Sequence, residues 1–176
     1  MDIRVVPFSL FHKYFTMKKI ILLAIVAATT LMSCGTPKTV QESRKVLKGY
    51  WNLDNISYDR SGTFNITVFN DTSAECFEGS IWRFIPNNNT GRYTIDNMDC
   101  PTGERNFIFT IVEIDPASGL YDFMVKPTNA KGKSEDNSGY RLHLAQLSEN
   151  NMRWEQTVSL EGRPFKIMMD FSKIQE

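Results

Sequence analysis

Apolar and polar residues alternate in short segments between residues 50 and 171, and turn-forming residues separate these segments. The alternation is clearest over residues 140–144 and 152–160. Successive side chains of a strand point to opposite faces, so a period of two predicts strands with one buried and one solvated face. No long stretch keeps the helical period of 3.6. We therefore predict an all-β domain, with strands at residues 50–58, 63–69, 80–85, 91–97, 105–114, 120–126, 139–147, 152–160 and 165–171.

The connections between these segments are mostly short and rich in turn-forming residues. They lie at residues 86–91, 115–119, 148–151 and 161–164. Short connections make neighbouring strands hairpin partners, which favours a small up-and-down antiparallel barrel of about eight or nine strands over a sandwich. The longer polar segment from Pro127 to Gly139 is expected to be a mobile loop at a barrel mouth. Asp71 is expected to cap a short helix that follows it.

The N-terminal part of the chain has the pattern of an export leader. Met17-Lys18-Lys19 precede an apolar run, Ile20 to Met32, that is shorter than the ~20 residues of a membrane-spanning helix. The run ends in Leu31-Met32-Ser33-Cys34, which resembles the bacterial lipobox. The alternative is an ordinary secretory signal followed by a coincidental cysteine.

These patterns predict three segments. Residues 1–33 are an upstream extension and signal peptide with the true start at Met17, residues 34–46 are a flexible tether lipidated at Cys34, and residues 47–174 are the barrel. The expected location is the cell envelope, as an outer-membrane lipoprotein, with the periplasmic face favoured over the cell surface and the lipid on Cys34 holding the protein to the membrane. The whole chain has 20 basic and 20 acidic residues, so it lacks the basic excess expected of a nucleic-acid partner.

Gly49-Tyr50-Trp51, at the head of the first predicted strand, resembles the Gly-x-Trp signature of lipocalins. Residues 47–174 resemble the lipocalin-like domains of lipoproteins from Gram-negative bacteria, most closely at residues 76–82, 87–89 and 139–142. The resemblance implies a calycin-type barrel in which Trp51 packs across the closed end. The chain departs from many lipocalins because no long amphipathic helix follows the last predicted strand.

Cys76 and Cys100 form an even pair in an exported domain, where disulfides persist. We predict that they are joined. The alternative, a nucleophilic or redox cysteine, lacks a Cys-x-x-Cys spacing and a nearby histidine.

We find no catalytic motif and expect no enzyme activity, cofactor or metal. His143 is the single histidine after Cys34 and lies on the polar phase of a strand, so we expect it to be solvated. The carboxylates Asp96, Asp99, Glu135 and Asp136 could be paired acids or calcium ligands, but acids in polar turns are usually only solvated.

The remaining candidate site is the barrel interior. Trp51, Ile167 and Met169 are expected there, together with seven aromatic residues that are the candidate ligand-binding residues: Trp82, Phe84, Phe107, Phe109, Tyr121, Phe123 and Trp154. A barrel of this size is either filled by its side chains or holds one small molecule. The residues leave both possibilities open, and the resemblance favours a pocket.

Two functions follow from these two possibilities. The first is a lipid-anchored, non-enzymatic protein that binds or carries a small hydrophobic molecule. The alternative is an interaction or inhibitor module with a packed barrel, whose protein partner the sequence does not identify. An open apolar cavity would favour the first function, and a filled barrel with an exposed aromatic patch would favour the second.

Overall fold

The computed structural model describes residues 38–115, 117–118 and 120–175. The leader, Cys34 and the first part of the predicted tether lie outside the described residues. Within the part of the chain that is described, no helix has both the length and the apolar character needed to span a membrane.

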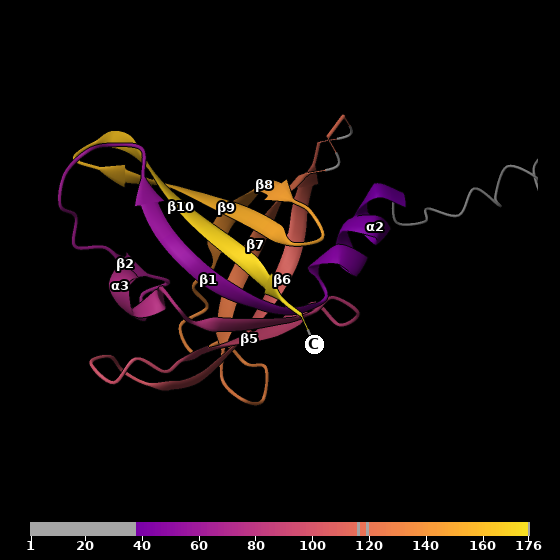
Figure 1. Ribbon diagram of the computed structural model, residues 1–176, viewed down its shortest axis with the longest axis horizontal. Helices are drawn as coiled ribbons and strands as arrows, with labels where there is room; N and C mark the ends of the chain where they lie inside the picture. The colour runs from indigo at the N-terminus through magenta and orange to yellow at the C-terminus, as the bar shows by residue number, and fades with distance from the viewer. Residues whose placement is uncertain (1–37, 116, 119, 176) are drawn as a thin grey trace, which may run out of the picture. The chain divides into compact units, whose positions relative to one another are not determined.

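Eight antiparallel strands form a closed barrel (Figure 1). They follow one another around the barrel in the order β1-β10-β9-β8-β7-β6-β5-β4, and β4 closes the barrel by pairing with β1. This arrangement confirms the predicted all-β, up-and-down architecture. The bounds are β1 Gly49–Tyr58, β4 Ile81–Ile85, β5 Thr90–Ile95, β6 Gly103–Ile114, β7 Tyr121–Thr128, β8 Tyr140–Leu147, β9 Asn151–Leu160 and β10 Arg163–Ile174.

The predicted strand at residues 63–69 is wrong. Only Thr67–Val68 is extended there, as β2, and it pairs with β3, Thr72–Ser73, in a small separate sheet. The chain reverses between them because Phe69 and Asn70 adopt φ angles of 52° and 55°, in the left-handed region. A short helix, α3 (Ala74–Phe77), follows. We call residues 67–80 the plug.

Asp71 does not cap this helix. Ser73 occupies the N-cap position and makes no side-chain capping bond. The Asp71 carboxylate instead accepts a hydrogen bond from the Tyr93 hydroxyl and pairs with Arg105. Because Tyr93 and Arg105 lie on barrel strands far along the chain, no local pattern could reveal these partners.

Residues 38–46, predicted as part of a flexible tether, belong to helix α2, Lys38–Leu47. The helix is fastened at its C-terminal end, where Leu47 joins the core and its carbonyl accepts a hydrogen bond from Trp51 Nε1 at 2.9 Å. Trp51 is fully buried, and the Lys173 ammonium lies 5.1 Å from the centre of its ring. We call this end of the barrel the α2 end.

The plug lies on the side of the barrel away from α2, which we call the plugged end (Figure 1), and it leads directly into β4. Backbone hydrogen bonds join it to β1, from Gly79 N to Leu53 O and from Leu53 N to Ser80 O. Glu78 adds a side-chain bond, because its carboxylate accepts from the backbone N–H of Ile56.

Candidate binding site

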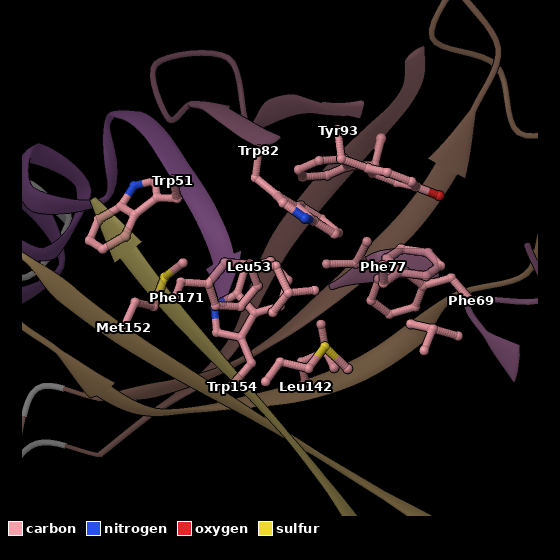
Figure 2. Packing of buried hydrophobic residues seen from close by; sticks show 14 of the residues in the cluster. Trp51, Leu53, Phe69, Phe77, Trp82, Tyr93, Leu142, Met152, Trp154 and Phe171 are labelled. Atoms are coloured by element: carbon pink, nitrogen blue, oxygen red, sulfur yellow. The ribbon is translucent and has the colours of Figure 1, made fainter. Parts of the chain in front are cut away.

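All seven aromatic residues proposed to line a ligand site point into the barrel, and each is at most 4% exposed. Their rings contact one another. The centroids of Trp82 and Trp154 are 5.4 Å apart, and those of Phe123 and Trp154 are 5.0 Å apart. At such distances the rings pack directly against each other. The structure therefore brings the predicted residues together, as a packed core in which the rings occupy the space around Trp82 and Trp154 (Figure 2).

Two further aromatic residues come from the plug. Phe77 packs on Tyr93 with ring centroids 5.2 Å apart, and Phe69 contacts Phe77, Trp82 and Tyr140. Figure 2 shows Phe69 and Phe77 on the side of the core away from Trp51. The plug thus closes its end of the barrel with the same kind of side chain that fills the interior.

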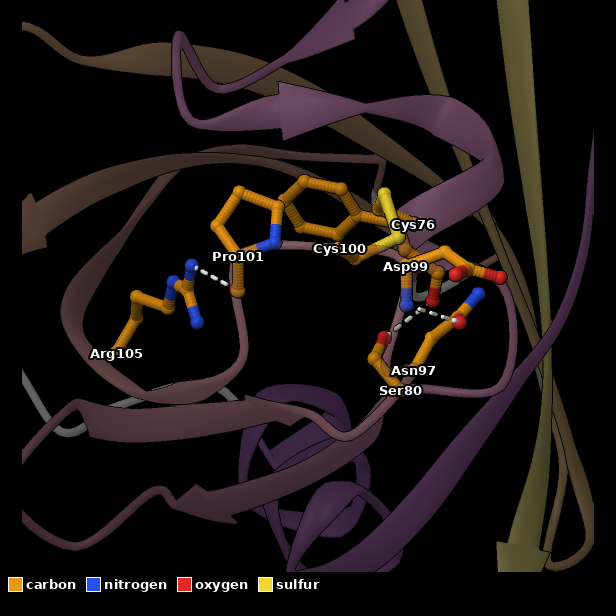
Figure 3. The surroundings of a disulfide bond; sticks show 8 residues. Cys76, Ser80, Asn97, Asp99, Cys100, Pro101 and Arg105 are labelled. Atoms are coloured by element: carbon orange, nitrogen blue, oxygen red, sulfur yellow. Dashed lines mark hydrogen bonds between the residues drawn. A yellow bond between two sulfur atoms is a disulfide. The ribbon is translucent and has the colours of Figure 1, made fainter.

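A disulfide fastens the plug. Cys76 of α3 is bonded to Cys100, which lies between β5 and β6, and this confirms the predicted pairing (Figure 3). A chain of hydrogen bonds adds to the attachment, because Trp82 Nε1 donates to the Ser80 hydroxyl, which donates to the Phe77 carbonyl. The plug is consequently held by one covalent bond and by polar contacts to β4.

A hollow of about 310 Å³ lies beside the plug. Phe69 and Tyr93 give it an aromatic floor, and polar side chains from the plug, β6 and the loop after β7 surround this floor. We call it the mouth hollow. Its lining residues are Phe69, Asn70, Asp71, Tyr93, Arg105, Asn106, Pro127, Thr128, Asn129, Glu135 and Asp136.

An ordered polar network forms one wall of the mouth hollow. The Asp71 carboxylate accepts from the Tyr93 hydroxyl at 2.8 Å and from Arg105 Nε at 2.9 Å. Burial, with the nearby Asp71 carboxylate, raises the pKa of Tyr93, so its hydroxyl stays protonated and donates. Because these groups satisfy one another, the wall is preorganised.

The loop that follows β7 adds two acids to the lining. Glu135 and Asp136 border the hollow on the loop that follows β7. Hydrogen bonds from the backbone N–H and the hydroxyl of Ser138 hold the pKa of Asp136 below its ordinary value, so this carboxylate is charged at neutral pH. With Asp71 and Arg105, the lining carries three acids and one base, and it combines an apolar floor with hydrogen-bond acceptors.

No protein-family model matches this chain, and no curated protein matches it. Among solved structures, a lipocalin-like protein from Bacteroides uniformis matches with a TM-score of 0.45 and 10% sequence identity, over 73% of this chain and 99% of that chain. The strand order is that of a closed up-and-down barrel of eight antiparallel strands, the architecture that the lipocalin resemblance of the sequence implies. Gly49 and Trp51 stand at the head of its first strand.

The other residues considered from the sequence lie away from the mouth hollow or at its edge. His143 lies on the outer surface of the barrel, with its Nδ1 2.7 Å from Asp122 Oδ1. Burial, the largest effect on Asp122, raises its pKa, but hydrogen bonds involving His143 and Arg141 outweigh it and leave the pKa lowered. Asp96 and Asp99 are exposed. In the described ranges, no group of three or more His, Cys, Asp or Glu side chains could hold a metal ion.

The sequence missed Phe69, Phe77 and Tyr93 as site residues. The alternation pattern places Phe69 in a barrel strand. Only the left-handed φ angles of two successive residues, Phe69 and Asn70, show that the chain leaves the barrel there. The polar pair Asn70-Asp71 before a short helix is the one local signal of a turn. The position of Tyr93 at the hollow depends on the plug folding back onto β5.

Proposed function

We propose that this protein is a non-enzymatic, lipid-anchored binding protein of the cell envelope, and that a small hydrophobic molecule binds in its mouth hollow. The mouth hollow is the observation that carries the proposal, because it joins an aromatic floor to a preorganised polar wall. Binding sites for small molecules typically combine apolar walls with a few convergent polar groups. A volume of about 310 Å³ lies at the lower end of the range for such sites, so the ligand is small.

The packed interior supports a site at the mouth. A ligand between Trp82, Phe84 and Trp154 would have to displace rings that already contact one another. Opening that space means losing dense packing, which is costly in a protein interior. A ligand on Phe69 and Tyr93 contacts the outer surface of the same aromatic cluster without disturbing it.

Lipidation at Cys34 would hold the site near a membrane. Three residues separate Cys34 from Lys38, the first residue of α2. A fully extended chain over this interval spans at most about 14 Å. On our proposal the barrel therefore stays close to the periplasmic surface of the outer membrane.

The proposal can be tested by native mass spectrometry of protein purified from its own host, followed by calorimetric titration with a panel of small apolar molecules. We expect saturable binding with a negative heat-capacity change. Glu135→Trp places a large ring over the mouth hollow at an exposed position and should weaken binding at least about tenfold, which corresponds to ~1.4 kcal/mol.

The matched control is Glu149→Trp. Glu149 is also an exposed glutamate, but it lies in the turn after β8 at the α2 end. This variant makes the same change of charge and size, and it should bind like the unmodified protein. Absence of saturable binding across the panel would remove the small-molecule proposal.

The filled interior also favours a second candidate, a protein-interaction module. The outer surface of β6 and β7 has a shallow groove of about 500 Å³ that includes Ile108, Val112 and Met124. Val112 is 48% exposed, although it is a large apolar residue. Apolar side chains at such a groove suit a protein partner. The test is capture of an envelope protein by the purified barrel. Loss of this binding in Val112→Lys, together with its retention in Glu135→Trp, would support this candidate.

A further inference from the structure

Three hollows follow one another along the outer face of β6. The mouth hollow shares Asn106, Thr128 and Asn129 with a second hollow of about 260 Å³. This second hollow shares Ile108 with the groove on the outer surface of β6 and β7. Residues that line two hollows at once stand at their common border, so the three hollows are neighbours. We call this row of hollows, along residues 105–112 of β6, the β6 track.

The β6 track has the length of a short extended chain. Its floor is made of outward side chains of β6, which alternate with inward ones such as Phe107 and Phe109. Residues 105–112 span about 24 Å, at ~3.4 Å per strand residue. The loop that follows β7, residues 129–139, borders all three hollows in turn. A linear molecule of about seven extended residues would fill this row.

The mouth end of the β6 track carries negative charge. Glu135 and Asp136 line the mouth hollow there, and no ion pair joins either carboxylate to a basic side chain of the described residues. The charge of Asp71, in contrast, is balanced by Arg105. A basic group of a partner would therefore meet two uncompensated carboxylates at this end.

The middle of the β6 track presents an amide that has no partner. Asn106 lines both the mouth hollow and the second hollow, and its side chain makes no hydrogen bond to another residue that the structure describes. Thr128 lies directly opposite Asn106 on β7 and adds a hydroxyl to the same two hollows. A side-chain amide carries both a donor and an acceptor, so it complements a peptide group.

The far end of the β6 track is apolar. Ile108 and Val112 of β6 and Met124 of β7 line it. Val112 is 48% exposed, and Ile108 and Met124 are half-buried. Each of these side chains can lose more surface to a partner, and removal of apolar surface from water favours association.

One kind of linear molecule matches all three parts. An acyl chain would leave the two carboxylates and the amide unmatched, and a glycan would leave the apolar end unmatched. We propose that the β6 track docks an extended peptide segment of a partner protein, with a basic side chain at the mouth end and apolar side chains on Val112 and Met124. Successive side chains of an extended peptide point to opposite sides, so alternate residues of the partner would face the track.

This proposal goes beyond the second candidate function, which uses only the groove at the far end. It does not depend on a small molecule in the mouth hollow. A partner bound to the groove alone would be indifferent to the charge of Glu135, whereas an extended segment that reaches the mouth end would not be.

The probe is a synthetic peptide of seven residues with arginine at one end, followed by serine and valine in alternation, and with both ends blocked. The reversed sequence tests the other direction along the track. Fluorescence anisotropy with the full protein should show saturable binding of one of the two. Glutamine in place of the arginine should weaken binding about tenfold, and high salt should reduce this difference because it screens exposed charges.

Two protein variants test the two ends separately. Glu135→Gln combined with Asp136→Asn should remove the preference for arginine over glutamine, and Glu149→Gln at the α2 end should leave it unchanged. Val112→Lys should weaken binding of both peptides at least about tenfold. Met98→Lys is its matched control, because Met98 is an apolar residue that is 94% exposed and lies outside the track.

Several results would overturn the proposal. These are no saturable binding of either peptide, equal affinity for the arginine and glutamine peptides, and unchanged binding in Val112→Lys. A dimer in sedimentation of the protein alone, abolished by Val112→Lys, would assign the track to a second copy of this chain. An envelope partner that is lost in Val112→Lys but indifferent to Glu135→Gln would keep the second candidate function and remove the extended track. Failure of the small-molecule panel, with peptide binding intact, would remove only the small-molecule proposal.

Discussion

At the scale of single residues, the aromatic packing decides where the backbone tolerates a side chain. Gly91 of β5 lies directly beneath Phe107. A Cβ atom at residue 91 would stand 2.2 Å from Phe107 Cζ and 2.8 Å from the Arg83 carbonyl oxygen. Both distances are far below van der Waals contact, and the carbonyl belongs to the paired strand β4. The absence of a side chain at Gly91 is therefore required by the position of the Phe107 ring.

We predict that Gly91→Ala lowers the free energy of unfolding by about 1–3 kcal/mol, the usual cost of overpacking a core. Gly139→Ala is the control, because the nearest atom to its added Cβ is Met124 Sδ at 3.0 Å, in a flexible side chain that can move. Urea denaturation of both variants measures the difference. Equal effects of the two substitutions would contradict the steric explanation.

Buried hydroxyls give the protein an alkaline limit. Burial raises the pKa of Tyr121 to about 12, above its ordinary value of 10.0, and burial also raises the pKa of Tyr93. Because the folded protein favours the protonated hydroxyls, this stabilisation is complete below pH 10 and is lost as the pH rises through 12.

We predict that the tyrosinate absorbance of the folded protein develops in two stages. In the later stage Tyr121 and Tyr93 ionise, together with unfolding. Tyr121→Phe should remove one late ionisation and move alkaline unfolding to higher pH. Ionisation of Tyr121 and Tyr93 near pH 10, with the fold intact, would show that these hydroxyls are accessible.

At the scale of elements, the plug is the part of the fold that departs from a simple meander. It consists of two very short strands and one turn of helix, which make few regular hydrogen bonds of their own. Its position depends on Phe69 and Phe77, on Glu78, and on the disulfide to Cys100. An element of this kind is expected to be less stable than the barrel strands around it.

We predict that replacing both Cys76 and Cys100 with serine lowers the free energy of unfolding by roughly 3 kcal/mol, since the bond closes a loop of 24 residues. The barrel strands should persist, and the plug should become the first site of limited proteolysis. Reduction of the unmodified protein should reproduce both effects. Unchanged stability and an uncut plug would mean that the noncovalent contacts hold it alone.

At the scale of the whole molecule, a lipid on Cys34 and a short connection to α2 would make the barrel a membrane-attached domain. We predict that Cys34→Ser releases the protein from the membrane fraction after a high-salt wash, because a single signal peptide without lipid leaves no anchor. The melting temperature of the released variant should equal that of the unmodified protein from which the lipid-bearing segment has been cleaved. Retention in the washed membranes would contradict lipid anchoring at this residue.

Local sequence information determined the barrel strands and their order. Alternation predicted eight barrel strands close to their observed bounds, and short turns made neighbours pair, because side-chain period and turn chemistry act over a few residues. The pairing of Cys76 with Cys100 could also be predicted, because so few cysteines were available.

Only the tertiary structure decided what the barrel contains and where a ligand could bind. The inward residues were predicted, but whether Trp82 and Trp154 surround a cavity or touch each other depends on distances between strands that no local pattern encodes. The plug and the network of Asp71 with Tyr93 and Arg105 each join residues far apart in the chain. Such contacts exist only once the barrel has closed, and for that reason the sequence predicted the scaffold while the structure determined the candidate site at its mouth.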